Sequence, residues 1–181
     1  MILGAVLAGG QSSRFGSDKA LAELDGASLL ARAVDSLSAW CDKVVVVGRE
    51  EAPAPTLPDW PHAGMGPLGG IAAALHLARD EDFEAVLTLG VDTADLPDNL
   101  PALLAPAPAY LASQPVIGLW PVSTAAAVED ILRGTGKHSL RALIERTGAR
   151  AVRLEREPAN INTQADLAAL RDKAGETGDG L

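Results

Sequence analysis

Short apolar runs that are typical of buried β-strands alternate along this chain with longer segments of helical periodicity. The clearest run is VVVV at residues 44–47, and β-branched residues favour strands because they pack well on a pleated surface. Two further runs, Ile2–Leu7 and residues 85–91, are almost entirely apolar, as expected for strands buried on both faces. Such strands, separated by helices, predict an α/β fold with a mostly parallel sheet.

Helical patterns occupy the intervals between these runs. Residues 28–40 place apolar side chains at spacings of three and four. Pro67 opens an apolar segment that predicts a helix over residues 66–79, since proline is tolerated in a first helical turn. Thr163, with Asp166 three residues later, has the spacing of a helix N-cap. The other predicted elements are a helix from about residue 98, a strand at 115–122, helices at 124–132 and 139–147, a strand at 150–154 and a helix at 164–173.

We find no internal repeat and no linker-like stretch in the 181 residues, a length that suits one globular domain. We therefore expect a single doubly wound domain over residues 1–173, with helices on both faces of the sheet. A flexible, Gly-rich tail is expected over residues 174–181. In such sheets ligands bind outside the carboxyl ends of the strands, so the loops after Leu7 and after Val91 are the candidate site.

The charge balance excludes several classes of partner. The chain has 15 Lys and Arg against 24 Asp and Glu, a net charge of −9, which disfavours binding to nucleic acid or to an anionic membrane surface. A single cysteine excludes an internal disulfide framework and a Cys-cluster metal site. No apolar run approaches the roughly 20 residues that span a bilayer, and the apolar start lacks the basic region of a signal peptide. We expect a soluble, cytoplasmic protein.

The loop after the first predicted strand carries residues suited to phosphate binding. Gly9, Gly10 and Gly16 allow tight turns and close approach of the backbone, and N–H groups in such loops can converge on phosphate oxygens. Arg14 and Lys19 are the only cations in the first 31 residues, and both side chains bind phosphate. From these residues alone, a solvated surface loop is the alternative.

Two common phosphate-binding patterns do not fit. Gly10 and Gly16 are separated by five residues and Lys19 is three residues after Gly16, whereas a Walker loop has the pattern G-x-x-x-x-G-K-[ST]. The sequence GMGPLG at residues 64–69 matches G-x-G-x-x-G, but it follows a Pro-rich stretch instead of a strand. We interpret this second match as accidental.

The segment L-A-G-G-x-S-x-R-x-G-x-D-K at residues 7–19 resembles the opening of the molybdenum cofactor guanylyltransferases, within the wider nucleotidyltransferase superfamily. Four later segments resemble that family in the same order: GPLGG at 66–70, VDT at 91–93, QPVIGLW at 114–120 and NINT at 160–163. The resemblance therefore extends from Leu7 to about Leu170. It implies a nucleotide-diphospho-sugar transferase-like fold.

The resemblance also implies an activity: Mg²⁺-dependent transfer of GMP from GTP to the terminal phosphate of molybdopterin cofactor, with release of pyrophosphate. Proteins that deliver the cofactor, or molybdoenzymes that accept it, are the implied protein partners. The nearest rival activity is that of a cytidylyltransferase for the same cofactor, but Gly9-Gly10 stands where such relatives commonly have Ala-Gly. A nucleotidyltransferase for a sugar or another small phosphorylated acceptor, and a catalytically silent nucleotide-binding protein, are more distant rivals.

Site residues follow from the same resemblance, and Arg14, Lys19 and Asp92 are the implied catalytic set. Asp92 is the implied Mg²⁺ ligand, and Lys19 the implied partner of the transition state. The implied GTP contacts are Leu7, Ala8, Gly9, Gly10, Lys19, Asp59 and Asp92; the candidate contacts on the cofactor side are Lys137, Arg141, Asn160 and Asn162. The chain departs from the family's usual residues at Phe15 (usually Met), Val47 (often Asn) and Gln114 (His).

Nucleotidyl transfer is compatible with these residue types. The reaction brings one phosphate oxygen onto another phosphorus, so catalysis is mostly alignment and neutralisation of charge. Mg²⁺ is commonly held by one or two carboxylates together with substrate phosphates. Because a phosphate nucleophile is already ionised at neutral pH, the reaction does not require a Ser-His-Asp set.

Overall fold

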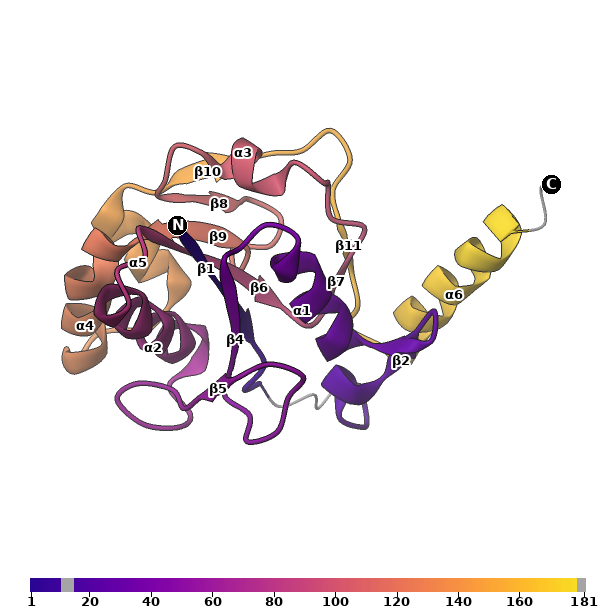
Figure 1. The fold of residues 1–181 in the computed structure, drawn as a ribbon, viewed down its shortest axis with the longest axis horizontal. Helices are drawn as coiled ribbons and strands as arrows, with labels where there is room; N and C mark the ends of the chain where they lie inside the picture. The colour runs from indigo at the N-terminus through magenta and orange to yellow at the C-terminus, as the bar shows by residue number, and fades with distance from the viewer. Residues whose placement is uncertain (11–14, 179–181) are drawn as a thin grey trace.

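The computed structural model describes residues 1–10 and 15–178, and a seven-stranded sheet forms its centre (Figure 1). The strand order is β10-β8-β9-β6-β1-β4-β5. Neighbouring strands are parallel except where β9 runs antiparallel to β6 and β8. These strands are β1 (Ile2–Leu7), β4 (Lys43–Val47), β5 (Thr56–Leu57), β6 (Ala85–Gly90), β8 (Ala109–Leu111), β9 (Gly118–Pro121) and β10 (Arg150–Val152). The predicted α/β fold with a mostly parallel sheet is confirmed.

Helices cover both faces of the sheet, as predicted (Figure 1). One face is covered by α1 (Leu29–Ser38) and α3 (Leu100–Leu104), and the other by α2 (Gly66–Asp80), α4 (Ala125–Arg133) and α5 (Leu140–Thr147). The last helix, α6 (Gln164–Gly178), extends away from the sheet beside the hairpin of β2 (Glu23–Leu24) and β3 (Ala27–Ser28). The remaining elements are the 3-10 helices η1 (Lys19–Leu21) and η2 (Val122–Thr124), and a ribbon of β7 (Thr93–Ala94) and β11 (Ala159–Asn160). Within the described ranges, none of the helices combines the length and hydrophobicity needed to cross a membrane.

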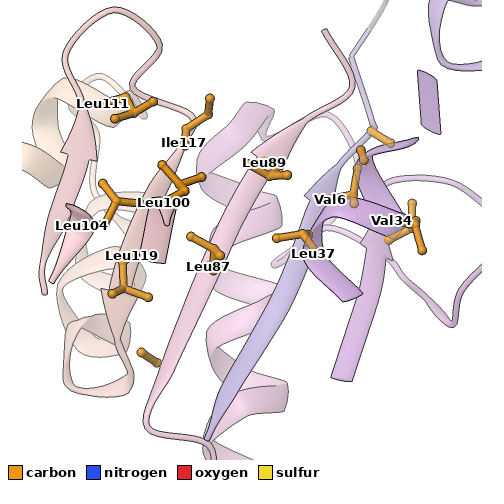
Figure 2. Packing of buried hydrophobic residues seen from close by; sticks show 14 of the residues in the cluster. Val6, Val34, Leu37, Leu87, Leu89, Leu100, Leu104, Leu111, Ile117 and Leu119 are labelled. Atoms are coloured by element: carbon orange, nitrogen blue, oxygen red, sulfur yellow. The ribbon is translucent and has the colours of Figure 1, made fainter. Parts of the chain in front are cut away.

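The core has two layers because successive strand residues point to opposite faces. In β1, Leu3 and Ala5 pack in the cluster under α2, whereas Val6 joins the cluster under α1. Figure 2 shows this second cluster, in which leucines of α1, α3 and β6 pack against one another. Trp120 is fully buried in the first cluster and is therefore a core residue. Burial contributes roughly 1.5–3 kcal/mol per large side chain, so the strand ends that bear the site are held from both faces.

Most predicted elements are present, with different ends. The strand predicted at 115–122 is only β9, because residues 122–124 turn into η2. The helix predicted to end at residue 173 continues through Gly178, although Gly175 lies within it. Residues 179–181 of the predicted tail lie outside the described residues. The predicted N-cap is confirmed, because the Thr163 N–H donates to Asp166 Oδ2 (2.9 Å) and the Asp166 N–H donates to Thr163 Oγ1 (3.1 Å).

A close approach of two backbones fixes the start of the first loop against the end of β4. Gly48 has φ +88°, and a Cβ added to it would lie 2.5 Å from Gly9 Cα and 2.8 Å from Gly9 N. Both the left-handed conformation and the missing space exclude a larger residue.

We therefore expect Gly48→Ala to lower the free energy of unfolding by about 2–4 kcal/mol, measured by chemical denaturation. Gly26→Ala is the matched control, since Gly26 has φ +80° but open space around its position. This control should lower the free energy of unfolding by only about 1 kcal/mol, the cost of placing a Cβ on a left-handed backbone. Equal losses in both variants would show that the contact with Gly9 is unimportant.

Candidate functional site

A pocket of about 320 Å³ opens at the carboxyl ends of β1, β4 and β6, the edge at which doubly wound sheets bind ligands. These three strands are parallel neighbours, so the loops that follow them meet there. Both loops singled out from the sequence contribute to it. Its described lining comprises Leu7, Ala8, Gly9, Gly10, Asp18, Lys19, Ala20, Val47, Asp59, Gly64, Gly66, Pro67, Gly70, Gly90, Val91, Asp92 and Val116.

The first loop enters the pocket directly from β1. The Ala8 N–H donates to Val47 O (2.9 Å), which ties the loop to the end of β4. All four predicted nucleotide contacts at residues 7–10 line the pocket. Arg14, the first predicted cation, lies outside the described residues.

Lys19, the second predicted cation, lies in the pocket wall beside Asp92. It belongs to η1, which Asp18 caps by accepting the Ala20 N–H (3.2 Å). Lys19 Nζ donates to Ile161 O (3.1 Å) and lies 3.8 Å from Asp92 Oδ2, with 15% of the side chain exposed. These fixed partners hold the ammonium in one place, which pre-organises it to meet an anion.

Asp92 follows β6 after one intervening residue, and its backbone is anchored because the Ile161 N–H donates to Asp92 O (2.7 Å). Gly90 provides the space for the carboxylate, since a Cβ at Gly90 would lie 2.6 Å from Asp92 Oδ1. The 3.8 Å between the Asp92 carboxylate and Lys19 is longer than a hydrogen bond. Oxygen lone pairs of this 30% exposed side chain therefore remain for another ligand.

Asp59 reaches the pocket from the Pro-rich segment between β5 and α2. Its carboxylate lies among glycines: a Cβ on Gly9 or on Gly70 would be 3.7 Å from one of its oxygens. Burial raises the pKa of Asp59, and a hydrogen bond from the Gly64 backbone partly offsets this. No salt bridge joins Asp59 to any cation in the described ranges. A carboxylate of this kind repels phosphate but suits a neutral group with adjacent N–H or O–H donors.

The described lining is negatively charged overall, because it carries the carboxylates of Asp18, Asp59 and Asp92 against the single ammonium of Lys19. A polyanionic ligand would therefore need further positive charge at this site. Asp18 is the lining carboxylate that sequence reasoning missed, although it stands within the G-x-D-K part of the quoted motif.

The C-terminal segment supports the first loop, which sequence reasoning also missed. A small separate cluster of buried side chains joins Phe15 to Ile161 and Leu167. Gln164 Nε2 donates to Phe15 O (3.4 Å). These residues are about 150 positions apart in the chain, and periodicity does not report such contacts. The apolar Ile161 between the polar residues of NINT was the signal available in the sequence.

The residues predicted on the cofactor side are absent from the described lining of the pocket. Arg141 pairs with Glu145 (2.9 Å) on the surface of α5. Lys137 is exposed between α4 and α5, Asn160 lies exposed in β11, and Asn162 is exposed before α6. Their contact with a second substrate stays a prediction.

Comparisons with known proteins agree with one another. The family model of the MobA-like NTP transferase domain matches residues 4–153. The molybdenum cofactor guanylyltransferase of Acidiphilium cryptum is 39% identical over 179 residues, covering 91% of each chain. That of Rhodobacter capsulatus is 35% identical over 186 residues, covering 95% of this chain and 96% of the relative. The crystal structure of molybdopterin-guanine dinucleotide biosynthesis protein A from Archaeoglobus fulgidus has a TM-score of 0.75 at 21% identity, covering 97% of this chain and 100% of that one. This last similarity confirms the predicted fold type.

Proposed function

Because the chain belongs to the MobA-like NTP transferase family, we propose that it transfers GMP from GTP to the terminal phosphate of molybdopterin cofactor and releases pyrophosphate. The chain is a nucleotidyltransferase, and relatives at 35% and 39% identity are named for guanylyl transfer. The observation that supports the proposal most directly is the position of Lys19 beside Asp92, 3.8 Å apart in the pocket. A cation next to a carboxylate suits a triphosphate that arrives with a metal ion.

In the proposed reaction an oxygen of the acceptor phosphate attacks the α-phosphorus of GTP. The bond from that phosphorus to the oxygen that bridges to the β-phosphate breaks, and pyrophosphate leaves with the electron pair. Lys19 would neutralise charge that develops around the α-phosphate, and the backbone N–H groups of Gly9 and Gly10 would bind phosphate oxygens. Arg14 is the proposed second cation. The acceptor phosphate is already ionised, so the chain's task is to align two anions and to offset their mutual repulsion.

The residues present fit a divalent cation. The Asp92 carboxylate keeps lone pairs for a ligand, and Gly90 leaves the space around its Oδ1. Mg²⁺ usually keeps several waters and takes one or two carboxylates with substrate phosphates. Asp92 is therefore the proposed ligand. When bound, Mg²⁺ would supply the positive charge that the described lining lacks.

Asp59 is proposed to bind the guanine base. A carboxylate offers two acceptor oxygens, and guanine presents two adjacent donors, its N1–H and its 2-amino group. Cytosine presents one amino donor on the corresponding edge. Because a well-placed bidentate pair discriminates between bases by about 1–3 kcal/mol, Asp59 would favour GTP over CTP.

We expect Asp59→Asn to reduce the ratio of GTP to CTP affinity by roughly 10-fold, because the amide replaces one acceptor with a donor. Dissociation constants for both Mg²⁺-nucleotides, measured by calorimetry, check this. Asp80→Asn, an exposed change at the far end of α2, is the control. Equal weakening of GTP and CTP would mean that Asp59 binds the ribose instead of the base.

The activity itself is tested with the purified chain, Mg²⁺, GTP and molybdopterin cofactor. We expect stoichiometric pyrophosphate and the guanine dinucleotide form of the cofactor, with GTP preferred to CTP in direct competition. Binding of GTP without pyrophosphate release would identify a silent nucleotide-binding protein. Turnover only with a different phosphorylated acceptor would identify another nucleotidyltransferase.

A further inference from the structure

Arg49 forms a close ion pair with Asp18, a residue of the pocket lining. Arg49 Nη1 donates to Asp18 Oδ1 (3.1 Å) and Arg49 Nη2 donates to Asp18 Oδ2 (2.8 Å). This two-pronged geometry is the strongest that a guanidinium and a carboxylate adopt. The Arg49 side chain is 21% exposed. Its Nε is buried and lacks a hydrogen-bond partner within the described part of the chain. Among the described residues, the guanidinium therefore makes its hydrogen bonds to Asp18.

The sheet brings these two residues together. Leu7 pairs with Val47 in the parallel register of β1 and β4, so the chain leaving β4 runs beside the loop leaving β1. Gly48, with φ +88°, then turns the chain toward Arg49. The two partners are 31 positions apart, so the sequence alone does not show that they pair.

Their positions relative to the pocket differ. Asp18 belongs to the pocket lining, next to Lys19, and Arg49 does not. Asp18 also caps η1, the short turn that carries Lys19, through the Ala20 N–H. The hydrogen bond from Arg49 holds the pKa of Asp18 below its usual value, so the carboxylate stays ionised at a site proposed to receive a triphosphate.

We propose that Arg49 is a positioning residue for nucleotide binding that acts through Asp18: it cancels the negative charge that Asp18 would present to the triphosphate. This inference rests on the proposed function. It assigns a role to a cation that does not itself line the pocket and that the family resemblance did not single out.

A charge-cancelling role predicts an unusual mutational pattern. In Arg49→Ala, the unpaired Asp18 carboxylate repels the triphosphate, and we expect Mg²⁺-GTP to bind roughly 10- to 100-fold more weakly. Guanosine, which carries no phosphate, should bind within about threefold of wild type. Asp18→Asn alone should bind Mg²⁺-GTP no worse than wild type, because the amide keeps an acceptor for the Ala20 N–H and removes the repelling charge.

The double variant Asp18→Asn/Arg49→Ala gives the sharpest result. If Arg49 acts by neutralising Asp18, the second substitution should restore most of the lost affinity, to within about threefold of wild type. Arg49→Lys should be intermediate, since an ammonium supplies the charge without the planar fork. Arg146→Ala is the matched control, because it removes an arginine from an Arg–Asp pair (Arg146–Asp130, 2.9 Å) that joins α5 to α4.

Isothermal titration with Mg²⁺-GTP and with guanosine, on full-length variants whose folding is checked by circular dichroism, separates the outcomes. Failure of the wild type to bind Mg²⁺-GTP would overturn the proposed function, and this inference with it. Wild-type binding together with an unrescued double variant, or with equal losses for GTP and guanosine, would overturn the role of Arg49 alone. Should Arg49→Ala fail to fold, the comparison of wild type, Arg49→Lys and the double variant decides in the same way.

Discussion

Replacing Lys19 by alanine is expected to lower kcat by roughly 10²- to 10³-fold, the usual effect of removing one pre-organised charge from a transition state. The ammonium is held by Ile161 O at 3.1 Å and lies 3.8 Å from Asp92, so it needs no reorganisation when charge develops on the transferred phosphate. The loss should appear mainly in kcat, because the ground-state triphosphate retains its contacts with the backbone of the first loop. Steady-state pyrophosphate release at saturating GTP measures it.

Lys173→Ala is the matched control, since it removes the same charge from an exposed position on α6, outside the described pocket lining. It should leave kcat within about twofold of wild type. A Lys19→Ala variant with wild-type kcat would contradict the proposed transition-state role. An increase in KM with kcat unchanged would mean that Lys19 binds the nucleotide equally well in the ground state and in the transition state.

The arrangement of β1, β4 and β6 could be predicted because each strand is an unmistakable apolar run. Their parallel pairing follows from the intervening helices, and parallel strands end at one edge. Hence the loop after Leu7 and the residue Asp92 could be expected to meet, and both line the same pocket. The short strand β8 could not be predicted, since Ala109–Leu111 is too short to show a period.

Contacts across the chain were the part of the candidate site that sequence patterns do not contain. Lys19 and Ile161 are 142 positions apart, and Arg49 meets Asp18 only because two loops leave adjacent strands. Neither contact leaves a hydrophobic pattern in the local sequence, so neither could be predicted from such a pattern. The family resemblance supplied residue types at the site, but their mutual geometry depends on packing of the C-terminal segment against Phe15.

Replacing Asp92 by asparagine should lower kcat by roughly 10²- to 10³-fold and raise the metal concentration needed for half-maximal turnover. The amide is nearly isosteric but carries no negative charge, so it is a much poorer Mg²⁺ ligand. The fold should be unaffected, because the hydrogen bond that anchors this residue runs from Ile161 N–H to the backbone oxygen of Asp92. Turnover titrated with Mg²⁺, and Mn²⁺ binding followed by electron paramagnetic resonance with GTP present, provide the two measurements.

Asp95→Asn is the matched control for this change. Asp95 lies three residues further on, is exposed, and has φ +59°, a conformation that asparagine tolerates as well as aspartate does. It is absent from the described lining of the nucleotide pocket, so its metal titration should match the wild type. If Asp92→Asn and Asp95→Asn titrated alike, Asp92 would not be the metal ligand. If Asp92→Asn lost turnover while Mn²⁺ still bound with wild-type affinity, its carboxylate would act instead by orienting Lys19, the one charged group that it approaches among the described residues.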